Sequence, residues 1–286
     1  MATDIYQQVT DKILAQLESG VAPWVRPWTG TKGGLPYNAI SGKAYRGINT
    51  MLLYAPVGSE GDAWMTYKQA QDVGAQVRKG EKGSMIVFFK PWAVKDKNDP
   101  DSVSRMVPVL RSFTVFHTSQ IDNLPAKYLP VAPVPMTEPE RIAAAEKMMA
   151  QAIVNHGGDR AYYRPATDSI QLPNAAQFRD MADYYGTALH ELTHWTGAKN
   201  RCDREYGKRF GDTAYAREEL VAEMGAAFLC AQAGIEGKLQ HAEYIGNWIK
   251  VLKNDKRAVV VAAGAAQKAA DFVLGVKFEN RETVAA

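Results

Sequence analysis

The chain has 286 residues, 46% hydrophobic and 23% charged, which is ordinary for a soluble globular protein and excludes a largely disordered or fibrous chain. No apolar run reaches the roughly 20 residues of a membrane-spanning helix, and the N-terminus lacks the apolar segment of a secretory signal. Cys202 and Cys230 are too few for a disulfide framework, so we expect a cytoplasmic protein with no membrane partner.

Charge and aromatic residues are distributed unevenly along the chain. Residues 1–130 carry 15 Lys/Arg and 11 Asp/Glu, a net charge of +4, whereas the remainder carries 19 and 20, a net charge of −1. The first part also holds four of the six tryptophans, which are Trp24, Trp28, Trp64 and Trp92. Because rings stack on bases while cations follow phosphates, this composition is typical of a surface for single-stranded nucleic acid.

The N-terminal part is predicted to be an α+β domain. Apolar residues at helical spacing predict a first helix from Ile5 to about residue 18, and Gly20 ends it. Further helices are expected over about 48–55 and from Thr66 to Gly74. After a turn at 80–83, a strand over 84–92 is expected to pair with a second strand over 107–116.

A proline-rich segment predicts the domain boundary. Five of the fourteen prolines lie between Leu124 and Glu140, and such a run favours an extended connector over a helix. We therefore expect a first domain over 1–123, a linker over 124–140 and a second domain over 141–286.

The second domain is predicted to be mainly helical with a small β-sheet, within an α+β protein of two domains. Thr137 and Glu140 form a possible capping box, and the apolar face of the helix that follows extends to Ile153. Two short strands are expected at 160–164 and 169–173. Four further helices are expected over 179–196, where Gly197 is the cap, and over 215–233, 239–253 and 255–274.

One helix carries the sequence His190-Glu191-Leu192-Thr193-His194, an H-E-x-x-H motif. Residues four apart lie on one helix face, so both imidazoles can converge on one metal ion. Glu191 is offset around the helix and can reach a metal-bound water as general base without being a ligand. The motif indicates a metallopeptidase site, and the competing interpretation is two histidines on a solvated helix.

A catalytic zinc site usually has a third protein ligand. The extended motif with a third histidine is excluded because position 200 is Asn200. We predict Glu219 as the third ligand, with Glu223 orienting a histidine through its other ring nitrogen. Imidazole and carboxylate ligands suit one divalent ion, zinc first and manganese second. The competing carboxylates are Glu218, Asp203 and Asp212.

The remaining histidines, His117, His156 and His241, have no partner at a metal-binding spacing, and we predict that they are structural. Tyr244 or His241 could stabilise an oxyanion, although their spacing gives no support for this role.

Several segments together resemble a known family. The N-terminal part resembles the N-terminal domain of ArdC-type antirestriction proteins, and a similar domain occurs in plasmid conjugation primases of the TraC type. The segments that carry this resemblance are RPW (26–28), YNAISGKAYRGIN (37–49), WMTYKQA (64–70), VRKGEKG (77–83) and VLRSFTVFHTSQI (109–121). The zincin-like metallopeptidase domain of the same family is similar to SIQLP, ALHELTHWTG and REELVAEMGAAFL.

The resemblance implies a single-stranded-DNA-binding domain joined to a metal-binding domain. It implies a protein carried by mobile elements such as conjugative plasmids, which protects transferred DNA from the recipient's restriction enzymes. It also implies metal ligands at His190, His194 and Glu219 and a catalytic carboxylate at Glu191. His117 departs from the asparagine of the family's VFN pattern.

We therefore expect single-stranded DNA as a partner, with a protein substrate or a component of a restriction system as a second one. The alternative is a general cytoplasmic zinc metalloprotease that is recruited to DNA and has no antirestriction role. The predicted DNA contacts are Trp28, Tyr45, Arg46, Tyr67, Arg78, Lys79 and Lys82, and the competing interpretation is that the aromatic ones fill the core.

Overall fold

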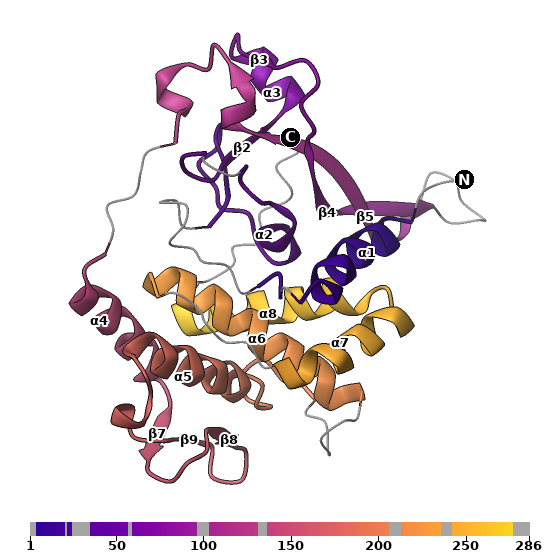
Figure 1. Ribbon diagram of the computed structural model, residues 1–286. Helices are drawn as coiled ribbons and strands as arrows, with labels where there is room; N and C mark the ends of the chain where they lie inside the picture. The colour runs from indigo at the N-terminus through magenta and orange to yellow at the C-terminus, as the bar shows by residue number, and fades with distance from the viewer. Residues whose placement is uncertain are drawn as a thin grey trace.

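The computed structural model describes residues 4–20, 22–24, 35–56, 59–95, 103–130, 136–205, 213–235 and 242–276. Figure 1 shows the strands of the N-terminal half on one side of a layer of helices from the C-terminal half, with the first helix lying beside that layer. The predicted α+β class is confirmed. None of the helices in these ranges has the length and apolar character needed to cross a bilayer.

The first helix, α1 (Ile5–Glu18), forms as the sequence predicts. The Asp4 side chain accepts a hydrogen bond from the Gln7 amide and caps its N-terminus. Gly20 follows the helix with a φ of 81°, which a residue with a side chain rarely adopts. The apolar stripe is buried on one face, because Val9, Ile13 and Leu17 are almost fully covered.

A four-stranded sheet of order β1-β2-β5-β4 organises the N-terminal half. The predicted hairpin is confirmed by the antiparallel pair β4–β5, whereas the short strands of this half were not predicted. A capping box at Thr66 starts α3, as its position in the sequence suggests. The elements are β1 (Tyr37–Asn38), α2 (Ile48–Leu52), β2 (Ala63–Thr66), α3 (Tyr67–Asp72), β3 (Gln76–Val77), β4 (Ser84–Lys95), β5 (Val103–His117) and β6 (Ile121–Asp122).

Asn49 of α2 fixes the position of the hairpin. Its side-chain amide donates to the Val87 carbonyl and accepts from the Val87 amide, both at 2.8 Å. Val87 and Leu110 consequently join the largest buried cluster. On the other face of the hairpin, Ile86 and Val115 join a second, smaller cluster.

The C-terminal half begins with α4 (Glu138–Met149), which the predicted capping box starts. Three strands follow in the order β7-β9-β8, so that β8 is an edge strand. The expectation that the helical face extends to Ile153 is wrong. The helix ends at Met149, and Ile153 begins β7 with 65% of its surface exposed. Its spacing matched a helix, but pairing with β9 determines its conformation. The strands are β7 (Ile153–His156), β8 (Tyr162–Arg164) and β9 (Ser169–Leu172).

The four predicted later helices are present. Asp180 caps the first of them at its N-terminus and Gly197 follows its end. The second is covered on nearly all sides, since most of its residues from Glu218 to Cys230 are buried. These helices are α5 (Met181–Thr196), α6 (Thr213–Ala233), α7 (Ala242–Asn254) and α8 (Ala258–Leu274), and short 3-10 turns lie at Thr118–Gln120, Ala126–Tyr128 and Ala175–Gln177.

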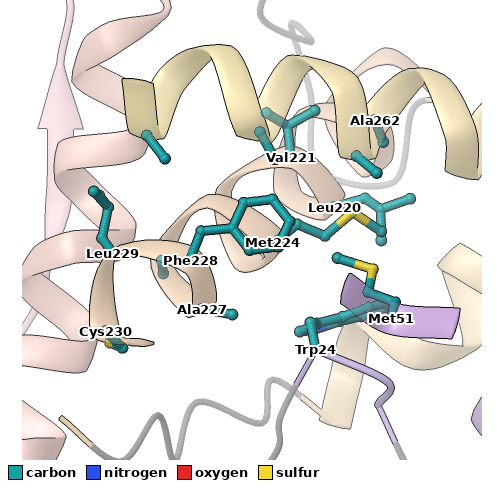
Figure 2. Close-up of a cluster of buried hydrophobic side chains, with 14 of the residues drawn as sticks. Trp24, Met51, Leu220, Val221, Met224, Ala227, Phe228, Leu229, Cys230 and Ala262 are labelled. Carbon is teal, nitrogen blue, oxygen red and sulfur yellow. The ribbon is translucent and has the colours of Figure 1, made fainter. Parts of the chain in front are cut away.

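The two halves of the chain share one hydrophobic core. Figure 2 shows Trp24 and Met51, from the N-terminal half, against Leu220 and Met224 of α6. The Trp24 ring also meets the edge of Trp248 on α7, with centroids 5.2 Å apart. Helices α1 and α2 and Trp24 are therefore anchored on the C-terminal helices.

Polar contacts reinforce this anchoring. Arg46 pairs with Asp271 of α8, and the Gly47 amide donates to the Gln267 side chain at 2.9 Å. At the other end of the contact, the Thr10 hydroxyl donates to the Lys256 carbonyl at 2.8 Å.

We expect Trp24→Ala to lower the free energy of unfolding by about 3–5 kcal/mol, because it removes a buried ring from the shared core. Val261→Ala is the control, since Val261 is 65% exposed on α8 and should change stability by less than about 0.5 kcal/mol. Denaturant unfolding followed by circular dichroism and by tryptophan fluorescence measures both. Because the core is shared, both probes should give one transition in the wild type, and two separate transitions would contradict it.

Candidate metal centre

Helix α5 brings the H-E-x-x-H residues together at its buried face. His190 and Glu191 are buried and His194 is nearly so. The two histidines lie one turn apart, and their Nε2 atoms face each other at 3.2 Å. The local sequence accounts for this, because Asp180 and Gly197 delimit a helix that carries both imidazoles on one side.

Glu219 of α6 completes a group of three donors. Its Oε2 lies 3.4 Å from His190 Nε2, and its Oε1 lies 3.6 Å from His194 Nε2. Ligands about 2.0–2.1 Å from a tetrahedral ion are about 3.3–3.4 Å apart. The three side chains, whose donor atoms all lie within 4.8 Å of one another, therefore fit one divalent ion.

Gly225 lets α6 approach α5 closely enough for this arrangement. A Cβ at Gly225 would lie 2.4 Å from Thr193 Cγ2 and 2.9 Å from its Oγ1. Thr193 sits inside the H-E-x-x-H motif and is fully buried. The sequence analysis did not single out this glycine, although a glycine inside a helical pattern is a recognisable signal.

Each imidazole also has a carboxylate at its other ring nitrogen. The Nδ1 of His194 lies 3.1 Å from Glu218 Oε1, and the Nδ1 of His190 lies 3.7 Å from Glu223 Oε1. At 3.1 Å Glu218 is within hydrogen-bond distance of His194, and a carboxylate there holds the proton on Nδ1 and directs the Nε2 lone pair into the site. At 3.7 Å Glu223 lies beyond hydrogen-bond distance of His190, so its orienting role stays a prediction. Glu218, considered as a competing ligand, faces the Nδ1 side of His194.

Arg204 holds Glu218 in place. Its guanidinium donates to both Glu218 oxygens at 2.8 and 3.0 Å, and also to the Thr193 carbonyl and the Thr196 hydroxyl. Burial raises the pKa of Glu218, but hydrogen bonds from His194 and Arg204 outweigh it and lower the pKa below its usual value. The sequence did not single out Arg204, which follows α5 and has no recognisable spacing to the motif.

We expect Arg204→Met to weaken divalent-metal binding about 10- to 100-fold, since partners behind the ligands typically have effects of this size. Titration calorimetry with Zn²⁺ and with Mn²⁺ on metal-stripped protein measures it. Arg217→Met is the matched control, because Arg217 is an exposed arginine of α6 that pairs with Asp255. Equal affinities in the two variants would contradict a role for Arg204.

Two tyrosines lie beside Glu219. The Tyr215 hydroxyl lies 3.1 Å from the Tyr244 hydroxyl and hydrogen-bonds to the Glu219 side chain. Burial, the Tyr244 contact and the Glu219 charge raise the pKa of Tyr215, so it keeps its proton. Tyr244 was considered from the sequence without support. Tyr215 was missed, although it precedes Glu219 by one helical turn.

The charges at this site favour a dication. Four carboxylates are buried here, and two positive charges face them when no metal is bound, the Arg204 guanidinium and the protonated His194 imidazole. Burial raises the pKa of Glu219, but the two imidazoles outweigh it and hold this pKa well below its usual range. Burial alone would lower the pKa of His194, yet Glu218 and Glu219 raise it to about 10. Buried carboxylates are costly unless a cation compensates them. The four buried carboxylates of this site are Glu191, Glu218, Glu219 and Glu223.

The other candidate ligands take no part in this group. His117 is buried, lies within hydrogen-bond distance of the Ser119 hydroxyl and the Gly61 carbonyl, and meets Trp64 edge-on. His156 contacts the Tyr184 hydroxyl at 2.8 Å. Asp203 is not among the grouped donors. Asp212 and His241 lie outside the described residues.

The predicted DNA contacts fall into two sets. Tyr45 is only 6% exposed and packs in the smaller cluster, which favours the competing interpretation that it fills the core. Arg46 is engaged by Asp271, and Trp28 lies outside the described residues. In contrast, the residues around β3 are exposed, and Arg78 there bonds to Glu81 and Asp122. The exposed set is Tyr67, Arg78, Lys79 and Lys82.

Comparison with known proteins agrees with this architecture. Residues 3–116 match the N-terminal domain of the anti-restriction factor ArdC, and residues 143–265 match a zincin-like metallopeptidase family. The crystal structure of metal-free ArdC from plasmid R388 is 40% identical and superposes with a TM-score of 0.80, covering 95% of this chain and 97% of that one. The Mn(II)-bound ArdC structure is 38% identical with a TM-score of 0.78, covering 97% and 100%.

Two sequence relatives cover almost the whole chain. The uncharacterized protein y4eC of Sinorhizobium fredii is 42% identical over 288 residues, which are 95% of this chain and 92% of that protein. The DNA primase TraC of Escherichia coli is 42% identical over 302 residues, which are 97% of this chain but 27% of the primase. The fold and the matched segments define an antirestriction-type N-terminal domain joined to a zincin-like metallopeptidase domain. The chain belongs to the ArdC family of antirestriction proteins, and the resemblance seen in the sequence is confirmed.

Proposed function

We propose that this protein is carried by a mobile element, binds single-stranded DNA and protects incoming DNA from host restriction in the recipient's cytoplasm. Membership of the antirestriction family supports this role. We further propose that His190, His194 and Glu219 bind one divalent ion at a site of metallopeptidase type. The observation that carries this second part is the convergence of their three donor atoms.

Zinc is the proposed ion and manganese the alternative, because two imidazoles and a carboxylate suit both. The related ArdC of plasmid R388 has been solved with Mn(II) bound. When bound, such an ion polarises a carbonyl group and lowers the pKa of a coordinated water toward about 7. The other roles in the reaction are carried out by side chains of the protein itself.

Glu191 is the proposed general base. The Tyr163 amide of β8 donates to its Oε2 at 2.8 Å and holds the carboxylate in place. In this position Glu191 takes a proton from the attacking water and returns it to the leaving amine. Tyr215 keeps its phenolic proton beside Glu219 and Tyr244 and can donate to negative charge that develops on a peptide carbonyl. The proposed second partner is a protein substrate or a component of a restriction system.

We expect Glu191→Gln to abolish any peptide cleavage while keeping the bound metal and DNA binding, because the two side chains are nearly isosteric. Antirestriction should survive this substitution, since shielding DNA needs only the DNA-binding surface. The measurement compares the wild type with Glu191→Gln in cells that receive unmodified plasmid DNA, alongside metal content and DNA affinity of the purified proteins.

Two outcomes would change this view. Loss of antirestriction in a variant that still folds and binds metal and DNA would make the peptidase essential. Peptide cleavage without any antirestriction by the wild type would favour a general zinc metalloprotease recruited to DNA.

A further inference from the structure

The hairpin β4–β5 has two different faces, and the register assigns each residue to one of them. Phe88 pairs with Arg111 and Lys90 pairs with Val109, so their side chains lie on one face because side chains alternate along a strand. Val87, held by Asn49, is buried on the opposite face. This contact fixes the direction in which Phe88 points.

Two phenylalanines are exposed on the first of these faces. Phe88 is 47% and Phe113 is 41% exposed, and their rings meet edge to face with centroids 6.0 Å apart. Earlier along the same face of β4, Ile86 is buried in the cluster that contains Trp64. The apolar face therefore continues beyond its core as an exposed pair of rings.

The charge of this face is positive. Lys90 and Arg111 are exposed and share the face with the two rings. The sequences of β4 and β5 contain four basic residues and no acidic one. A basic surface with exposed rings is complementary to a polyanion whose bases are unpaired.

We propose that the hairpin face, formed by Phe88, Lys90, Arg111 and Phe113, binds single-stranded DNA. The inference rests on the proposed function, because it names the surface through which the DNA is bound. Unpaired bases stack on the two rings, and the ammonium and guanidinium groups contact phosphates on either side. Duplex DNA keeps its base faces stacked inside the helix, so this surface discriminates against it.

The experiment measures the affinity of the full-length protein for a fluorescein-labelled oligothymidine by anisotropy. We expect Phe88→Ala and Phe113→Ala each to weaken binding about 10-fold, and the double variant to weaken it further, since each ring loses a stacked base. Phe88→Leu, which keeps an apolar side chain, should also weaken binding. Lys90→Gln should reduce the slope of log affinity against log salt by about 1.

Phe89→Ala is the matched control. Phe89 is the same residue type on the same strand and is 48% exposed, but it pairs with Leu110 on the opposite face. Its removal should leave the affinity within about twofold of the wild type, because no base stacks on that side. Unchanged melting temperature and metal content verify that each variant is folded.

The outcomes separate this proposal from the function on which it rests. If the wild type binds the oligonucleotide and the Phe88/Phe113 double variant binds equally well, the hairpin face is overturned and single-stranded-DNA binding stands. If the wild type fails to bind even at low salt, both the proposed hairpin face and the proposed single-stranded-DNA binding are wrong. If the double variant changes the sedimentation of the protein alone and not its DNA affinity, the face is a contact between copies of the chain and the proposal is wrong.

Discussion

Purified wild-type protein is expected to carry about one divalent ion per chain, and His190→Ala or His194→Ala is expected to remove it. Each substitution deletes one of three donors, and a site with two remaining donors cannot retain the ion through purification. Elemental analysis measures the loss. Glu219→Gln should weaken binding strongly, because a neutral amide replaces the only carboxylate among the three converging donors.

Stability supplies an independent readout of the same site. A ligand that binds only the native state raises the melting temperature, so a chelator should lower it in the wild type and leave it unchanged in His190→Ala. His156→Ala is the control, since His156 contacts Tyr184 and lies outside the donor group. Metal retained in Glu219→Gln but lost in Glu218→Gln would make the third-ligand assignment wrong.

Gly225→Ala is expected to destabilise the protein by about 1–3 kcal/mol, because it forces an extra methyl group into a packed contact. Thr193 cannot easily give way, since it is fully buried and its hydroxyl donates to the Leu189 carbonyl. Displacing α6 from α5 also moves Glu219 away from the imidazoles, so metal affinity should fall together with stability. Chemical denaturation and titration calorimetry measure the two effects.

For a helix glycine elsewhere in the chain, we expect substitution by alanine to have the opposite effect on stability. A Cβ at Gly264 of α8 would meet nothing within 4 Å, so Gly264→Ala should stabilise the protein by up to about 1 kcal/mol through helix propensity. Thr193→Ala in the Gly225→Ala background removes the clashing atoms and should restore part of the metal affinity. Equal effects of the two glycine substitutions would show that close packing at Gly225 is unimportant.

The sequence predicts the parts of the site that depend on one helix. The spacing of His190 and His194 places both imidazoles on one face whatever surrounds them, and the long helices and the hairpin follow from periodicity. The contacts of Arg204 and Tyr215 were beyond sequence reasoning, because they depend on how α6 is rotated and shifted against α5. Gly225 allows α6 to approach Thr193 of α5, and a glycine within a helical pattern marks a close contact without showing which residue it meets.

Long-range packing also explains why the contacts of Tyr45 and Arg46 in the N-terminal half could not be predicted from the sequence. Tyr45 looks like a base-stacking residue in the sequence, but it packs with Trp64, Ile86 and Val115 of three strands further along the chain. Arg46 looks like a phosphate contact, and its partner Asp271 is 225 residues away. In the hairpin, alternation shows which residues share a face. Which face stays exposed depends on Asn49 and on the helices beneath it.

The shared core limits how this protein can be divided by recombination. A crossover that transferred only the metallopeptidase segment would remove α1 from α7 and α8 and would remove the Trp24 ring that meets the edge of Trp248. The recipient gene would encode a helical layer with an uncovered apolar surface, which favours aggregation. Transfer of both segments together keeps this apolar surface covered. The match to the primase TraC, which covers 97% of this chain within 27% of that protein, is consistent with such joint inheritance.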